Sequence, residues 1–182
     1  TRLGLPGKSF SLGLVLTGLG SGYFHWAPHP ARLVWDCLPI TLIFVSLVAM
    51  VVEDRIGPRP ALRMLPFMIA AGAASVLYWH WARDMKFYVF VLSTSVVVLL
   101  FLMAAYPSRL LRNRDLMVAL LLHGLARACE LGDGEVFSWG GIVSGHSLKH
   151  ILSAVAAAWI LHATTREAGV RKAESGKQPQ AF

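Results

Sequence analysis

Three histidines and two other polar residues are spaced in a way that could support metal chemistry. Ser21 and His25 lie four residues apart at the end of an apolar run, and Asp36 opens the next run. His146 and His150, again four residues apart, open the last run. Residues four apart share one face of a helix. Three histidine ligands with a water in the fourth position are typical of catalytic zinc, so the pattern predicts a zinc site.

The last histidine pair also falls near the expected N-terminus of a helix. The positive end of a helix dipole disfavours a charged imidazolium. Neutral imidazole is the form that binds metals. Ionisable side chains are costly inside a membrane, so each one in an apolar run is a candidate for function.

The elements that must position these residues are long and apolar. The chain has 182 residues, of which 55% are hydrophobic and only 15% are charged, whereas soluble domains carry about 25% charged residues. A bilayer core takes about 20 helical residues, and we interpret six apolar runs as membrane-spanning helices. The runs are roughly Phe10–Trp26, Leu33–Val52, Leu62–Trp79, Phe87–Tyr106, Leu116–Cys129 and Val143–Ala163.

These runs predict an all-α fold, a polytopic membrane helix bundle. Barrel strands would alternate apolar and polar residues, and the stretch VFVLSTSVVVLLFLM does not,. We expect residues 1–164 to form the transmembrane domain and the polar residues 165–182 to form a disordered cytoplasmic tail. No signal peptide is evident before the first run.

Loop charges predict the orientation of the helices. Of the 17 Lys and Arg residues, only Arg32, Arg83 and Lys86 fall in loops on the side opposite Thr1. Cytoplasmic loops are rich in Lys and Arg, so the side of Thr1 is expected to be cytoplasmic. Counting helices then places the candidate site on the non-cytoplasmic side. The net charge of +7 follows from this topology, and the sequence shows no nucleic-acid-binding motif.

Two stretches, GLGSGYFHWAPHPARLVWDCLP and SGHSLKHILSA, resemble the signature regions of the alkaline ceramidase family. That family belongs to a superfamily of seven-helix membrane hydrolases, which also includes the adiponectin-receptor-like and hemolysin III-like proteins. The sequence RLVWDCLP is most similar to that of bacterial ceramidase-like members. The family's Ser, His, Asp and distal H-x-x-x-H fall on Ser21, His25, Asp36, His146 and His150. The family has seven spans, so the resemblance implies a further span before residue 1.

The resemblance implies an enzyme, a zinc-dependent hydrolase of linear amides. Its Zn²⁺ would be held by His25, His146 and His150 with a water. Asp36 would act as general base or orient that water, and Ser21 would hydrogen-bond the water or the developing oxyanion. The implied partners are a membrane lipid substrate, ceramide or a related lipid amide, and the lipid bilayer of a bacterial inner membrane, with no nucleic acid. The calcium ligands of eukaryotic members have no equivalent before Ser21.

Other functions remain open at this point. One is a receptor-like or regulatory membrane protein with a structural zinc, although such a zinc is more often closed by four protein ligands. Another is a haem protein, which is disfavoured because His146 and His150 lie on one helix face. A single histidine is also often a packed core group, and serine is common where membrane helices pack closely.

The other histidines, and the charged residues near the last two apolar runs, are expected to have structural roles. We expect Lys149 to reach toward the membrane interface and the acidic residues of the preceding loop to be solvated. Those acidic residues are Glu130, Asp133 and Glu135, and the histidines without a partner at ligand spacing are His29, His80, His123 and His162.

Overall fold

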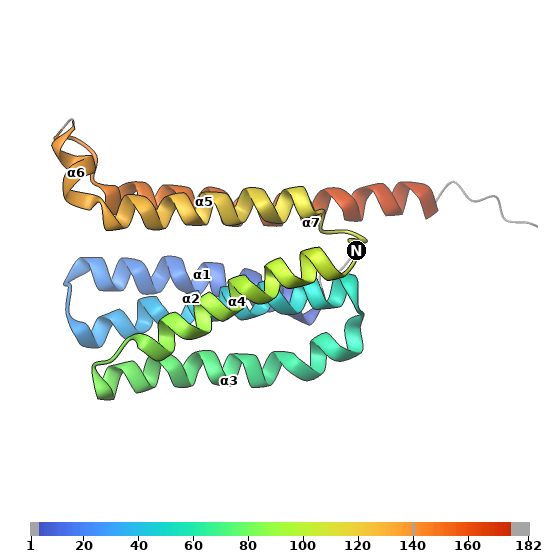
Figure 1. Cartoon of the computed structure of the whole chain (residues 1–182), viewed down its shortest axis with the longest axis horizontal. Coiled ribbons are helices and arrows are strands. Elements are labelled where there is room, and N and C mark those ends of the chain that lie inside the picture. The colour runs from blue at the N-terminus through green and yellow to red at the C-terminus, as the bar shows by residue number, and fades with distance from the viewer. Residues whose placement is uncertain (1–3, 140, 176–182) are drawn as a thin grey trace, which may run out of the picture. The chain divides into compact units, whose positions relative to one another are not determined.

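The part of the chain that the structure describes is mostly helical. The computed structural model describes residues 4–139 and 141–175, and this part holds seven helices and no strand (Figure 1). The predicted all-α class is confirmed. Each of the six apolar runs falls on its own helix, although the fourth ends one residue beyond its helix, at Tyr106, and the sixth begins two residues before its helix, at Val143. The helices form two compact units that divide between Ser108 and Arg109. We call them the four-helix unit (α1–α4) and the three-helix unit (α5–α7).

The four-helix unit is built around its second helix. Its members are α1 (Leu5–Trp26), α2 (Pro30–Arg55), α3 (Pro58–Ala82) and α4 (Lys86–Ala105). Helix α2 packs against the other three helices. Its most apolar stretch is 61% buried, against 28% for α3 and 22% for α4. Helix α2 is therefore the core of the unit, and α3 and α4 turn most of their apolar side chains outward.

Local sequence sets where these helices begin and end. The His29 ring accepts a hydrogen bond through Nδ1 from the backbone N–H of Ala31, at 3.2 Å. Pro30 follows at the first helical position, where a missing N–H costs nothing. Gly57, between α2 and α3, has φ = 147°, a conformation that favours glycine,. Arg83 ends α3 in the left-handed conformation.

A buried arginine links the ends of α2 and α4. The Arg55 side chain donates through Nη1 to the carbonyl oxygens of Tyr106, at 2.6 Å, and Leu102, at 3.4 Å. The last carbonyls of a helix have no partner within the helix itself. Arg55, which is only 3% exposed, satisfies the carbonyl of Tyr106 just beyond α4 and shares that of Leu102 with the backbone N–H of Tyr106.

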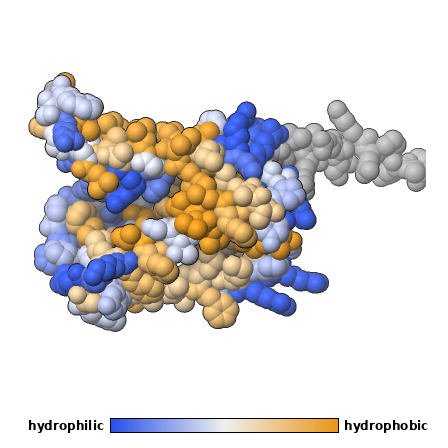
Figure 2. Space-filling model, in the orientation of Figure 1, coloured by the Kyte–Doolittle hydropathy of each residue, from blue (hydrophilic) through white to orange (hydrophobic). Residues whose placement is uncertain are grey.

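Three of the described helices, α2, α3 and α4, are long and apolar enough to cross a membrane. On α4 the outward side chains include Phe90, Val97 and Phe101, each more than half exposed. Figure 2 shows apolar side chains covering much of the face in view, with hydrophilic residues gathered mainly toward helix ends. Large exposed apolar surfaces mark contact with a membrane or a partner. The fold is thus compatible with a membrane protein.

The three-helix unit is an antiparallel pair of long helices, which a short helix connects at one end. Its members are α5 (Asn113–Leu131), α6 (Asp133–Ser138) and α7 (Gly145–Ser175). Helix α5 lies beside the first part of α7, and the end of α7 runs on past it (Figure 1). At the end of the pair remote from α6, the Arg166 guanidinium pairs with the Asp115 carboxylate at 3.2 Å. Asp115 is 1% exposed, so this ion pair fixes one end of the helix pair.

The last helix runs further than the sequence analysis expects. The tail was predicted to be disordered from residue 165, but α7 continues through Ser175. The segment TTREAGVRKAES lacks proline and is rich in alanine, arginine, glutamate and lysine, which favour helix once a helix is under way,. The rest of the predicted tail lies outside the described residues. The short helix α6 also lies in a segment expected to be a loop.

Candidate metal centre

The two histidines of the last helix converge. His146 and His150 lie in the first two turns of α7, with their Nε2 atoms 3.0 Å apart and their rings edge to face at 4.7 Å. Two nitrogen ligands on a tetrahedral zinc, each about 2.0–2.1 Å from the metal, are about 3.3 Å apart. The pair therefore fits two adjacent positions around one such ion with a small adjustment.

The contact between the two rings also restricts their protonation. As a hydrogen bond, this contact requires that one Nε2 carries the hydrogen and the other accepts it, and with both Nε2 atoms on a metal neither carries one,. Two imidazolium rings would bring two N–H donors face to face. At least one ring is therefore neutral, and neutral imidazole is the form that binds a metal.

Three contacts fix the turn that carries His146. The Ser144 hydroxyl accepts a hydrogen bond from the backbone N–H of Ser147 at 3.1 Å. The Asp133 carboxylate, at the start of α6, accepts one from the backbone N–H of His146 at 2.7 Å. Gly145 packs so closely on α5 that an added Cβ would overlap the carbonyl oxygen of Cys129. The first N–H groups of α7, which no helical carbonyl satisfies, are thus bonded from outside the helix.

A salt bridge fixes the next turn. The Lys149 ammonium pairs with the Glu130 carboxylate of α5 at 2.8 Å, and both side chains are mostly buried. Arg127 pairs with the same carboxylate. Partial burial raises the pKa of Glu130, but the hydrogen bond from Lys149 and the charges of Lys149, Arg127 and His146 outweigh it, and the pKa is lowered. The prediction of a lysine directed to the membrane interface and a solvated glutamate was wrong.

In the four-helix unit, glycines bring α1 and α2 together. A Cβ added at Gly20 would overlap the carbonyl oxygen of Trp35, and one added at Gly13 would press on the Ile43 side chain. Gly20 and Gly13 are seven residues apart, so they share one stripe of α1. Their partners run in the opposite direction along α2, which makes the two helices an antiparallel, closely packed pair.

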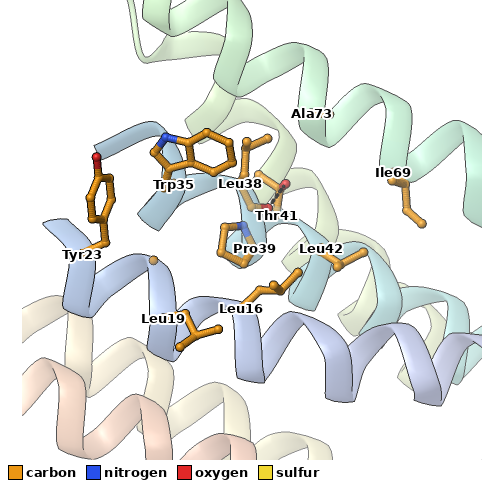
Figure 3. Close-up of a pocket in the computed structure, with 11 residues that line it drawn as sticks. Leu16, Leu19, Tyr23, Trp35, Leu38, Pro39, Thr41, Leu42, Ile69 and Ala73 are labelled. Atoms are coloured by element: carbon orange, nitrogen blue, oxygen red, sulfur yellow. Dashed lines mark hydrogen bonds between the residues drawn. The ribbon is translucent and has the colours of Figure 1, made fainter. Parts of the chain in front are cut away.

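An apolar cavity of about 590 Å³ lies on one side of this pair, between α1, α2 and α3 (Figure 3). On α1 it is lined by a stripe that includes Leu16, Leu19 and Tyr23. Each residue turns about 100° around a helix axis, so Ser21 and His25 lie roughly opposite that stripe. The α2 lining includes Trp35 and Leu38.

The predicted site residues of this unit therefore lie away from the cavity. Asp36 is turned by about 100° from Trp35, toward the other side of the α1–α2 contact. Ser21 and His25 lie on that same side. By the turn of an ideal helix, the three residues fall on the side of the α1–α2 contact away from the cavity, and none of them lines it.

Asp36 and Ser21 both have unused hydrogen-bonding capacity. Asp36 is 8% exposed, and its carboxylate makes no hydrogen bond or ion pair to any residue the structure describes. Two other hydroxyls of α1, Ser11 and Thr17, bond to carbonyls of their own helix at 3.0 and 2.8 Å. Ser21 makes no such bond within residues 4–139 and 141–175. The Asp36 oxygens are not among the fully buried polar atoms that lack a partner, so water can still reach them.

The five predicted residues divide between the two units, three on α1 and α2 and two on α7. His25 is exposed at the end of α1, with the Phe24 ring edge-on at 5.2 Å. His25, His146 and His150 each offer a ring nitrogen that could bind a metal ion. His29 instead caps α2, which agrees with its expected structural role.

Comparison with known proteins leaves this chemistry to be argued from the residues themselves. The chain matches no family model, no curated protein and no solved structure. The resemblance to the alkaline ceramidases thus depends on the two signature stretches and the five residues that they contain.

Proposed function

We propose that the protein is a zinc-dependent integral-membrane hydrolase that cleaves a lipid amide, with a ceramide or a closely related lipid as substrate. The observation that carries the proposal is the convergence of His146 and His150, with their Nε2 atoms 3.0 Å apart. In the proposal His25 completes the ligand set. Three histidines leave one position of a tetrahedral ion open for a water, which suits catalysis better than a closed structural site.

The proposed chemistry divides the work among the side chains. Held by these histidines, zinc would supply Lewis acidity and would lower the pKa of a bound water to about 7. The Asp36 carboxylate accepts a proton from the water as its oxygen attacks the amide carbon. The Ser21 hydroxyl donates a hydrogen bond to the carbonyl oxygen as it gains negative charge. The proton on Asp36 is then available to the leaving nitrogen, which departs as an amine when the C–N bond breaks.

A metal and turnover assay tests the proposal. The purified full chain is expected to bind close to one zinc and to hydrolyse a fluorescent ceramide. The His146→Ala/His150→Ala double variant is expected to lose both. His162→Ala is the matched control, because it removes a histidine of the same helix that has no partner at ligand spacing.

Three outcomes of this assay would count against the proposal. Stoichiometric zinc in the double variant would refute the ligand assignment. Zinc binding without turnover of any lipid amide would favour a receptor-like or regulatory protein with a structural zinc. Loss of zinc in His162→Ala would show that the double variant does not report on the ligands alone.

We also propose that α1, α5 and α7 cross the membrane with α2, α3 and α4, in a bacterial inner membrane. The candidate site would then lie on the non-cytoplasmic side and the C-terminus on the cytoplasmic side, as the loop charges favour. Cysteine accessibility in intact cells tests this, after Cys37 and Cys129 are replaced. Asp133→Cys is expected to react with an impermeant thiol reagent and Ser175→Cys is not. The opposite result would reverse the orientation, and labelling of both would mean that one of these helices does not cross.

A further inference from the structure

The candidate ligands on α7 sit where a helix is least stable by itself. His146 is the second residue of α7. The first N–H groups of a helix have no partner within it, so its first turn frays unless outside acceptors hold it. The distance of 3.0 Å between the two Nε2 atoms depends on that turn, because fraying would swing His146 away from His150.

One outside acceptor binds the ligand residue itself. The Asp133 carboxylate lies 13 residues earlier in the chain and accepts the backbone N–H of His146 at 2.7 Å. Hydrogen bonds to an ionised acceptor are about twice as strong as neutral ones. A carboxylate at a helix N-terminus also interacts favourably with the helix dipole. This bond therefore fixes the backbone of His146 specifically.

A second carboxylate holds the residue beside the other ligand. Glu130, at the end of α5, pairs with Lys149 at 2.8 Å, and Lys149 directly precedes His150. The pair joins α5 to the ligand-bearing turn of α7 and resists rotation of α7 about its own axis. Glu130 also lies close enough to His146 for the two to interact electrostatically.

We propose that Asp133 and Glu130 are positioning residues for the histidine pair, acting through the backbone of His146 and through Lys149 to hold the two ring nitrogens at ligand spacing. The proposal rests on the proposed metal site. Neither carboxylate is a ligand in it. Groups that orient metal ligands typically change metal affinity by 10- to 100-fold when they are removed.

The test measures the affinity of the full-length purified protein for Co²⁺, which reports its coordination by visible absorption, in competition with a chelator. Asp133→Ala is expected to weaken binding by about tenfold or more. Asp133→Asn keeps an acceptor oxygen and is expected to recover most of that loss. The matched control is Glu135→Ala, which removes an exposed acid of the same short helix and is expected to bind as the unaltered protein does.

The second arm of the test addresses Glu130. Glu130→Gln is expected to weaken Co²⁺ binding, and Lys149→Gln to weaken it by a similar factor. The double variant should lose less than the sum of the two single variants, because both changes break the contact between Glu130 and Lys149,. Fully additive losses would overturn the assignment of Glu130.

The outcomes separate this inference from the function on which it rests. If the unaltered protein binds no Co²⁺, the proposed function fails. If it binds Co²⁺ and Asp133→Ala binds equally well, the positioning inference fails alone. A loss of helical circular dichroism in Asp133→Ala would also overturn it, because the carboxylate would then serve folding in general.

Discussion

The two units hold their candidate residues in place by different physical means. In the three-helix unit, polar contacts do so, since Asp133 bonds to the backbone of His146 and Glu130 pairs with Lys149. In the four-helix unit, the main device is a close backbone approach, in which α1 meets α2 at Gly20. By the turn of an ideal helix, this contact has the cavity on one side and Ser21, His25 and Asp36 on the other.

The difference indicates which changes each unit tolerates. A polar anchor depends on one or two atoms and on charge, so an isosteric substitution can break it. A glycine contact depends on volume alone, so one methyl group can break it. The four-helix unit leaves the polar atoms of Ser21 and Asp36 unused within the described residues, whereas the three-helix unit uses its carboxylates for structure.

Removal of one proposed ligand from each unit is expected to have the largest effect. His25→Ala and His146→Ala should each reduce bound zinc from about one equivalent to none and reduce turnover to background, because a catalytic site needs all three ligands. Metal analysis of the purified variants checks this. Zinc retained in His25→Ala and lost in His146→Ala would confine the metal to the three-helix unit.

Removal of the carboxylate charge of Asp36 should have the next largest effect. Asp36→Asn is expected to keep its zinc and to lose about 10²- to 10⁴-fold in turnover, the usual contribution of a positioned base. Ser21→Ala should cost less, because one hydroxyl is only part of the stabilisation of the developing oxyanion. Steady-state kinetics with metal analysis measure both. A loss below about tenfold in Asp36→Asn would assign Asp36 to structure.

Methyl groups at the two close approaches test the packing itself. Gly20→Ala and Gly145→Ala should each destabilise the protein by about 1–3 kcal/mol, because each new Cβ meets a backbone oxygen that cannot move aside cheaply,. Thermal unfolding in detergent measures the change. Gly22→Ala and Gly124→Ala are the controls for α1 and α5, since an added Cβ meets nothing within 4 Å at either position. Equal effects in the controls would contradict the assignment of Gly20 and Gly145 as tight contacts.

The ion pair at the remote end of the three-helix unit should show the smallest effect. Asp115→Asn is expected to lower the free energy of unfolding by about 1–2 kcal/mol, since Asp115 is buried but Arg166 stays partly exposed and can be hydrated,. Asp84→Asn, in an exposed pair with Lys86, should leave the unfolding midpoint unchanged,. An unchanged midpoint in Asp115→Asn would show that the helix pair does not need this anchor.

Most of the helices could be predicted from the sequence, because a long apolar run without strand-like alternation favours a helix. The helix pattern also predicted that Ser21 and His25, and likewise His146 and His150, would share a face. Spacing of four residues converts directly into geometry. His29 was expected to have a structural role, but its capping of α2 was not predicted, although a polar residue directly before a proline is a known signal for a helix start.

The partners across the three-helix unit could not be predicted in the same way. Asp133 and Glu130 meet residues 13 and 19 positions away, and no helical or strand period links such separations. Their neighbours, GDGE, indicated only a turn. No local signal points to Asp133, because the capping residue that the sequence offers at this helix start is Ser144, three residues before Ser147,.

The sequence predicts six membrane spans, which is more than the structure establishes. Of the six runs interpreted as spans, the three on α2, α3 and α4 satisfy both length and apolar composition. Helix α5 carries Arg127 and Glu130, and α7 opens with polar residues. Polar residues of this kind lower the hydropathy of a helix, and Glu130 is one of the two carboxylates proposed to position the candidate ligands.

The bond from Arg55 to the end of α4 sets a limit on how the protein can be divided into fragments. A fragment that stops after α3 would retain the Arg55 guanidinium without the carbonyls of Leu102 and Tyr106, which accept its hydrogen bonds. Removing acceptors from a buried guanidinium leaves N–H donors unsatisfied, which destabilises the fragment. A fragment that ends beyond Tyr106 keeps both acceptors, so co-expression of two halves should reconstitute the protein when the break lies between α4 and α5 and fail when it lies between α3 and α4.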